Sequence, residues 1–162
     1  MMTKPVRSFF RRHTAFLVLL LMMVAIVPVM AAGAGKIAFS SNRHYVDPYY
    51  DNEIYIMNSD GTNIADLTNN ALESEDSYPA WSPDGTKIAF GSTRSGGDRN
   101  IWVMNSDGSN QERLTAELAL ENRPSWSPDC AKISFASSRL GGHFDIYVMN
   151  ADGSDQTRIT TT

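Results

Sequence analysis

The sequence has few of the residues that build disulfide frameworks, metal centres or nucleophilic sites. Of its 162 residues one is cysteine, Cys130, and three are histidine. A single cysteine excludes an internal disulfide, so the fold must be held by packing. No serine lies in a Gly-x-Ser-x-Gly motif, and neither His44 nor His143 has the spacing of a metal ligand. We therefore expect no catalytic site, no bound metal and no cofactor.

Basic residues are scarce beyond position 34. Four of the 14 basic residues and none of the 18 acidic residues precede residue 35, which leaves a formal net charge of −8 on residues 35–162. Phosphate binding needs a positive surface. The charge balance therefore argues against a nucleic acid as the partner.

The first 34 residues have the composition of a secretory signal peptide. A basic start is followed by an almost unbroken apolar run from Ala15 to Met30, in the order of the n-region and h-region. Small residues allow cleavage before Ala32 or before Gly35. The alternative is an uncleaved membrane anchor, because about 20 apolar residues can span a bilayer. We expect a periplasmic or secreted protein that contacts the membrane only through this segment, if it is not cleaved.

The rest of the sequence contains a threefold repeat. Residues 54–61 (IYIMNSDG) recur as residues 101–108 (IWVMNSDG) and 146–153 (IYVMNADG), at steps of 47 and 45 residues. An apolar triplet and a Ser-x-Arg motif precede each copy, and a Leu-Thr or Ile-Thr pair follows it. The segments 79–84 (PAWSPD) and 124–129 (PSWSPD) separate the units. This pattern indicates a repeat architecture.

Each complete unit is predicted to form four short strands. The apolar runs are short, rich in β-branched and aromatic residues, and bounded by Gly, Pro, Asn or Asp. Four strands in about 45 residues are typical of a β-propeller blade. We therefore expect an all-β fold of about three blades, each a four-stranded antiparallel sheet, in an incomplete ring. The units are residues 35–78, 79–123 and 124–162, and the first lacks the strand with the Trp-Ser-Pro motif, which leaves eleven strands.

The expected third strands are apolar on both faces. Ile101 and Val103 point to one side, whereas Trp102 and Met104 point to the other. A blade is covered on both faces by its neighbours, whereas a strand of a sandwich alternates apolar and polar residues. The repeated tryptophans are expected in the core rather than in a sugar-binding platform; they are Trp81 and Trp126.

Repeated turn residues are expected to close the hairpins. Asp-Gly pairs favour tight hairpin turns, and their spacing differs from that of a calcium-binding loop. The glycines concerned are Gly61, Gly108 and Gly153. Cys130 stands where the preceding unit has Gly85, so we expect it to occupy a turn position that favours glycine.

The order of these motifs resembles the propeller repeats of TolB and its relatives. Trp-Ser-Pro-Asp-Gly, Ile-Ala-Phe, Ile-Tyr-Val-Met-Asn-Ala-Asp-Gly and Leu-Thr occur together over residues 35–162. TolB is a periplasmic component of the Tol-Pal system, with a six-bladed propeller that binds a lipoprotein and an α/β domain ahead of it. The resemblance implies the propeller fold. This sequence has no segment that resembles the α/β domain, and its three units are too few to close a six-bladed ring.

An open array of blades leaves apolar faces uncovered at both ends. Three arrangements would cover them. Two chains could form one six-bladed ring, the chain could be a fragment of a longer protein, or the array could bind another protein.

One arginine per unit follows the expected second strand: Arg43, Arg94 and Arg139. Equivalent loops share one rim of a propeller, so these arginines could bind acidic groups of a partner. Alternatively, each ties its own blade together by pairing with the polar residue before the third strand, namely Glu53, Asn100 or Asp145. The long first loop adds three tyrosines to the candidate partner-binding rim: Tyr45, Tyr49 and Tyr50. This loop is either a binding loop or a neutral insertion.

These observations lead to two hypotheses about function. The first is an exported, non-catalytic interaction module of the cell envelope, with an unidentified protein partner. The second is a fragment of an exported enzyme, because similar propellers accompany serine peptidases and form lyase scaffolds.

Overall fold

The computed structural model describes residues 35–43, 52–69 and 74–160, and the expected signal segment lies outside these ranges. The described residues form strands, turns and loops, and they include no helix capable of crossing a membrane. The strands are β1 (Lys36–Ser41), β2 (Glu53–Asn58), β3 (Ala65–Asp66), β4 (Asp76–Trp81), β5 (Lys87–Ser92), β6 (Asn100–Asn105), β7 (Glu112–Arg113), β8 (Glu121–Trp126), β9 (Lys132–Ser137), β10 (Asp145–Asn150) and β11 (Thr157–Arg158).

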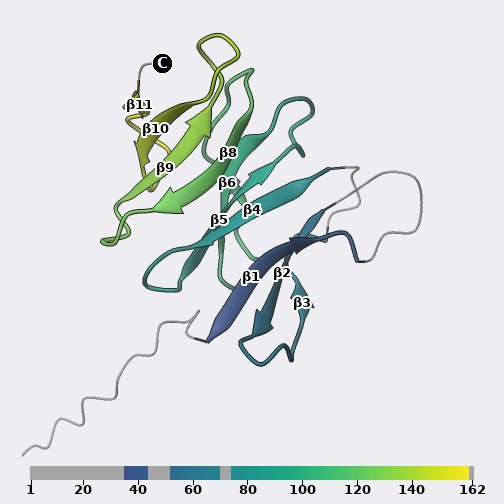
Figure 1. Cartoon of the computed structure of the whole chain (residues 1–162). Coiled ribbons are helices and arrows are strands. Elements are labelled where there is room, and N and C mark those ends of the chain that lie inside the picture. The colour runs from purple at the N-terminus through teal and green to yellow at the C-terminus, as the bar shows by residue number, and fades with distance from the viewer. Residues whose placement is uncertain (1–34, 44–51, 70–73, 161–162) are drawn as a thin grey trace, which may run out of the picture.

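The strands form three antiparallel sheets that follow one another along the array (Figure 1). Their orders are β1-β2-β3, β4-β5-β6-β7 and β8-β9-β10-β11, so each strand pairs with its neighbour in sequence. We call them blades 1, 2 and 3. The predicted all-β fold of unclosed propeller blades is confirmed. Blade 1 has three strands in the described residues, because no strand equivalent to β4 or β8 precedes β1 there.

The blades pack face to face through two hydrophobic clusters. Between blades 1 and 2, Ile54 and Ile56 of β2 contact Ile88 and Phe90 of β5. Between blades 2 and 3 the cluster consists of Ala89, Ile101, Val103, Leu114, Ile133, Phe135, Tyr147 and Met149. Strand β6 thus contributes to both clusters, as its two apolar faces predicted. The repeated tryptophans are partly buried against these clusters, Trp81 in the first and Trp126 in the second.

The hairpin turns adopt the backbone conformations that their residues favour. The three turn glycines have φ values of 83°, 86° and 86°, and they are Gly61, Gly108 and Gly153. Gly85 has a φ of 68°, and Cys130 at the equivalent position has a φ of 60°. The cysteine therefore occupies a left-handed conformation in which a Cβ is unfavourable.

A β-bulge interrupts the first strand of blades 2 and 3. The pairing of β4 with β5 shifts between Ser77 and Ala80, and the intervening Tyr78 has a φ of 58°. In β8 the equivalent Arg123 has a φ of 54°. Each bulge directly precedes a proline, which has no N–H to donate and is tolerated within a strand mainly at bulges and edges. The strand therefore extends upstream of the proline, and β4 begins at Asp76 rather than at Pro79.

Candidate functional site

The guanidinium group of Arg94 is bonded within its own blade. Its Nε donates to Ser92 Oγ at 3.0 Å, its Nη1 donates to Gln111, and its Nη2 pairs with the carboxylate of Asp76. The side chain of Asp76 is fully buried, and that of Arg94 is 12% exposed. Because a buried carboxylate needs a paired charge, this ion pair ties the end of β5 to the start of β4.

Blade 3 repeats this arrangement at Arg139. Its Nε donates to Ser137 Oγ at 3.0 Å, its Nη1 donates to Gln156 Oε1 at 3.0 Å, and its Nη2 pairs with Glu121. The carboxylate side chain is again fully buried. Both arginines also lie over a pair of aromatic rings of their own blade, which adds cation–π attraction.

The partners of these arginines within their blades differ from the polar residues named in the within-blade alternative. Asn100 and Asp145, just before the third strand, were expected to receive the arginines of blades 2 and 3. Instead Asn100 donates to a backbone carbonyl, and Asp145 pairs with Arg158 at 2.6 Å. The observed partners lie 18 positions ahead of each arginine. That constant spacing was the available signal, and it was missed because the second and third units were expected to begin at residues 79 and 124, after these carboxylates.

Arg43 occupies the equivalent place in blade 1, but its surroundings are incomplete. Its guanidinium carbon lies 4.8 Å from the ring centroid of Phe39 and 5.0 Å from that of Tyr55. Its Nε donates to Ser41 Oγ at 3.3 Å. Arg43 is exposed, and within the described residues it forms no ion pair, not even with the expected Glu53. The first strand supplies the carboxylate in the other blades, and within the described residues blade 1 lacks this element.

The three predicted rim arginines differ in how they are bonded. Arg94 and Arg139 use their guanidinium groups within their own blades, whereas within the described residues Arg43 donates only through Nε and forms no ion pair. The three predicted rim tyrosines lie outside the described residues: Tyr45, Tyr49 and Tyr50. A partner-binding rim formed by all six residues stays a prediction.

The acidic residues of the turns are used for local hydrogen bonds. Asp107 Oδ1 accepts bonds from the backbone N and Oγ of Ser109, at 2.9 Å and 2.6 Å. These bonds hold the pKa of the Asp107 carboxyl below its usual range, and the bond from the hydroxyl of Ser109 contributes most. Asp60 and Asp152 make the same turn with the same effect on their pKa. Among residues 35–43, 52–69 and 74–160, no three potential metal ligands cluster together.

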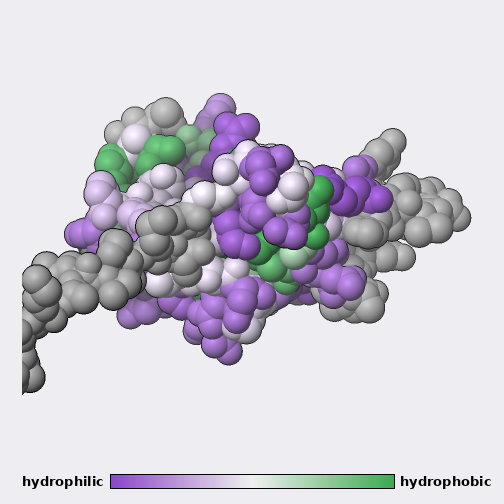
Figure 2. Space-filling view, turned by 90° about the horizontal axis from the view of Figure 1, so that it is seen from below, coloured by the Kyte–Doolittle hydropathy of each residue, from purple (hydrophilic) through white to green (hydrophobic). Residues whose placement is uncertain are grey.

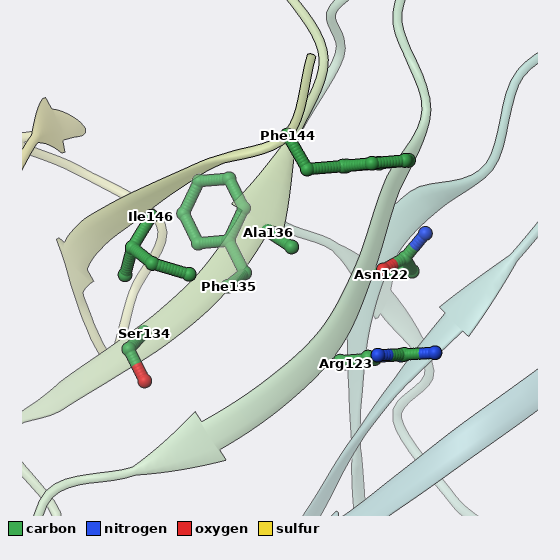
Figure 3. A pocket seen from close by; sticks show the side chains of 7 residues that line it. All are labelled: Asn122, Arg123, Ser134, Phe135, Ala136, Phe144 and Ile146. Atoms are coloured by element: carbon green, nitrogen blue, oxygen red, sulfur yellow. The ribbon is translucent and has the colours of Figure 1, made fainter. Parts of the chain in front are cut away.

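Blade 3 ends in an exposed apolar face, here called the tail face: Phe144, Ile146 and Ile159. Ile146 is 42% exposed, whereas the equivalent Ile101 of blade 2 is fully buried against the next blade. A cavity of about 370 Å³ lies on this face. Its lining includes Asn122, Arg123 and Phe144 (Figure 3).

Blade 1 ends in a second uncovered face, here called the head face: Ile37, Phe39 and Met57. Ile37 is 42% exposed, whereas the equivalent Ile88 and Ile133 are fully buried. Figure 2 shows separate hydrophobic patches among hydrophilic side chains on the side of the molecule seen from below. Both ends of the array thus present surface that adjacent blades cover elsewhere in the chain.

The repeat, the blade topology and the inter-blade contacts are those expected of one known family. The sequence profile described as the TolB beta propeller domain matches residues 79–162, about half of the chain. The chain belongs to this TolB β-propeller family. No curated protein matches the sequence significantly.

Solved structures of TolB proteins resemble this family member along most of its length. A putative TolB from Agrobacterium tumefaciens is 27% identical with a TM-score of 0.67, and the match covers 79% of this chain and 46% of that one. TolB from Acinetobacter baumannii is 22% identical with a TM-score of 0.61, covering 79% and 30%. The chain thus spans less than half the length of either TolB.

A propeller from a protease shares the fold. The β-propeller domain of the Trilobed protease from Pyrococcus furiosus is 19% identical with a TM-score of 0.58, covering 76% of this chain and 38% of that one. At this identity the similarity shows the fold alone.

Proposed function

We propose that the chain is an exported, non-catalytic protein-interaction module of the cell envelope. The observation that supports this most directly is the exposure of blade faces at both ends of the array. Ile37 and Ile146 are each 42% exposed, although their repeat equivalents are fully buried. Apolar side chains exposed on such a face are typical of protein-binding sites. The TolB relatives and the apolar leader support the envelope as the location.

A second copy of the chain is one partner that would fit the head and tail faces, because the repeat makes these two faces complementary. Within the chain, the face of blade 2 that carries Ile101 packs on the face of blade 3 that carries Ile133. Ile146 is equivalent to Ile101, and Ile37 is equivalent to Ile133. The tail face of one copy therefore matches the head face of another, and two such contacts would close a six-bladed ring.

A pull-down from envelope extract tests the interaction module. The purified protein serves as bait, and an unrelated exported propeller serves as the control bait. The proposal expects one or a few proteins to be enriched by this chain alone. A folded bait that enriches no protein over the control would contradict it.

A propeller scaffold within a longer exported enzyme is the second candidate. The shared fold of the Trilobed protease propeller, of which this chain spans 38%, favours it. Reading the genomic DNA beyond the codon for Thr162 separates the two candidates. An in-frame hydrolase or lyase domain there would support the enzyme and overturn the proposal of a non-catalytic module.

A further inference from the structure

Within the part of the chain that the structure describes, one hydrogen-bonding edge of strand β1 is unpaired. In blades 2 and 3 the equivalent strands are paired on both sides, β5 with β4 and β6, and β9 with β8 and β10. In the described residues β1 pairs with β2 alone. An unpaired strand edge is a template for adding an extended segment.

Arg43 follows the C-terminal end of β1, and no carboxylate of the described residues pairs with it. Arg94 and Arg139 are paired with the first residue of the strand that lies beside β5 or β9. Arg43 has the same serine and aromatic neighbours but is exposed and has no acidic partner in the described residues. A strand added to β1 in the same register would place its first residue opposite Ser41, as Asp76 lies opposite Ser92.

The buried indole N–H of Trp81 is a second observation that favours an added strand beside β1. Trp126 Nε1 of blade 3 donates to the carbonyl oxygen of Ala80 in β4, at 3.1 Å. Trp81 Nε1 of blade 2 is buried and has no hydrogen-bond partner among the described residues. The equivalent acceptor would lie on a strand beside β1, opposite Ala38, as Ala80 lies opposite Ala89.

We propose that the edge of β1 binds an extended segment of a partner protein that begins with Asp or Glu. The residue four positions after this Asp or Glu accepts a hydrogen bond from Trp81 Nε1 through its backbone carbonyl oxygen. Residues 1–34 contain no acidic residue, so they cannot supply the carboxylate for Arg43. Strands β4 and β8, which have the required pattern, are already paired in their own blades. This inference rests on the proposed interaction function and names the chemistry of the partner.

A peptide with the sequence of residues 119–129 (ALENRPSWSPD) is the probe. Its glutamate and tryptophan have the spacing seen in β8. We expect saturable binding to the purified protein, weakened about tenfold by Arg43→Gln because a charge-assisted hydrogen bond is lost. Arg113→Gln, the same change on the outermost strand of blade 2, is the matched control and should leave binding unchanged.

A double-mutant cycle separates the ion pair from a general effect on folding. Replacing the peptide glutamate with glutamine should weaken binding about tenfold to the native protein and hardly at all to the Arg43→Gln variant. In ¹⁵N-labelled protein the indole N–H resonance of Trp81 should shift on binding, and that of Trp126 should not. Absence of saturable binding, or binding that is independent of Arg43, would overturn the proposal. Conversion of a dimer into monomers by the peptide would show that a second copy occupies the edge, which also overturns it.

The peptide test and the pull-down can fail separately. If the peptide does not bind while the pull-down enriches a partner, the strand site is wrong and the interaction module stands. If the peptide binds through Arg43 while no envelope protein is enriched, the strand site stands and the proposed function is wrong.

Discussion

At the scale of residues, the chain contains its own control for the buried ion pair. Arg94 and Arg43 follow the same Ser-x-Arg motif and lie over two aromatic rings each. Arg94 compensates the fully buried carboxylate of Asp76, whereas Arg43 is exposed and compensates none among the described residues. The two positions therefore separate the contribution of the pair from that of the stacking.

Arg94→Met is expected to lower the free energy of unfolding by about 3 kcal/mol, because it removes the guanidinium that pairs with the fully buried carboxylate of Asp76. Arg43→Met should cost less than about 1 kcal/mol, since exposed charges contribute little. Urea denaturation of both variants and the native protein measures the difference. Equal losses at the two positions would contradict this account of the ion pair.

The aspartates of the hairpin turns predict a loss of stability in acid. Local hydrogen bonds lower the pKa of Asp60, Asp107 and Asp152 in the folded chain. Ionisation therefore favours folding above their unfolded pKa of about 4, and this contribution is lost as the pH falls through the folded pKa values. The urea midpoint should change little from these groups between pH 7 and pH 5 and fall below about pH 4. A variant with asparagine at all three positions should show a smaller fall, and an unchanged fall would refute this origin.

At the scale of elements, the sequence predicted the strands better than the contacts between them. The motif order gave eleven strands, the turns and the incomplete blade 1, because apolar runs and turn residues act locally. The partners of Arg94 and Arg139 were not predicted. The bulges at Tyr78 and Arg123 let each first strand continue upstream of its proline, to the carboxylate that pairs with the arginine. That shift depends on pairing with the next strand, which local patterns do not record.

The approach of neighbouring blades can be tested at two matched glycines. Gly61 and Gly108 have φ values of 83° and 86°. A Cβ at Gly108 would lie 2.9 Å from the carbonyl oxygen of Leu67 in blade 1, whereas a Cβ at Gly61 would have nothing within 4 Å. Blade packing therefore constrains only the second of these positions.

Gly61→Ala should cost about 1 kcal/mol of unfolding free energy, from the left-handed backbone alone. Gly108→Ala should cost a further 1 kcal/mol or more, roughly, because the added methyl group forces blade 2 away from blade 1. Thermal or urea denaturation of the two variants provides the comparison. If the two losses were the same, the close contact between the blades would carry no energetic weight.

At the scale of the whole molecule, the exposed apolar faces at the two ends of the array determine the expected state of association. Tail-face side chains such as Ile159, which is 61% exposed, have counterparts such as Leu114 that are buried between blades. Each complete inter-blade contact in this chain includes a buried apolar cluster. An array with two such faces in water has a strong driving force for association. The head and tail faces are complementary by repeat, so self-association is the expected result.

The molecular mass of the purified protein in solution tests this central claim most directly. Light scattering after size exclusion should give twice the mass of one chain, as closure of a six-bladed ring requires. Ile146→Asp on the tail face should shift the mass toward that of a monomer, because it places a charge in the contact. Leu118→Asp, a similar change at a side chain that is 97% exposed on the loop between β7 and β8, should leave the dimer intact. A native protein with the mass of a single chain, unaffected by Ile146→Asp, would contradict the account.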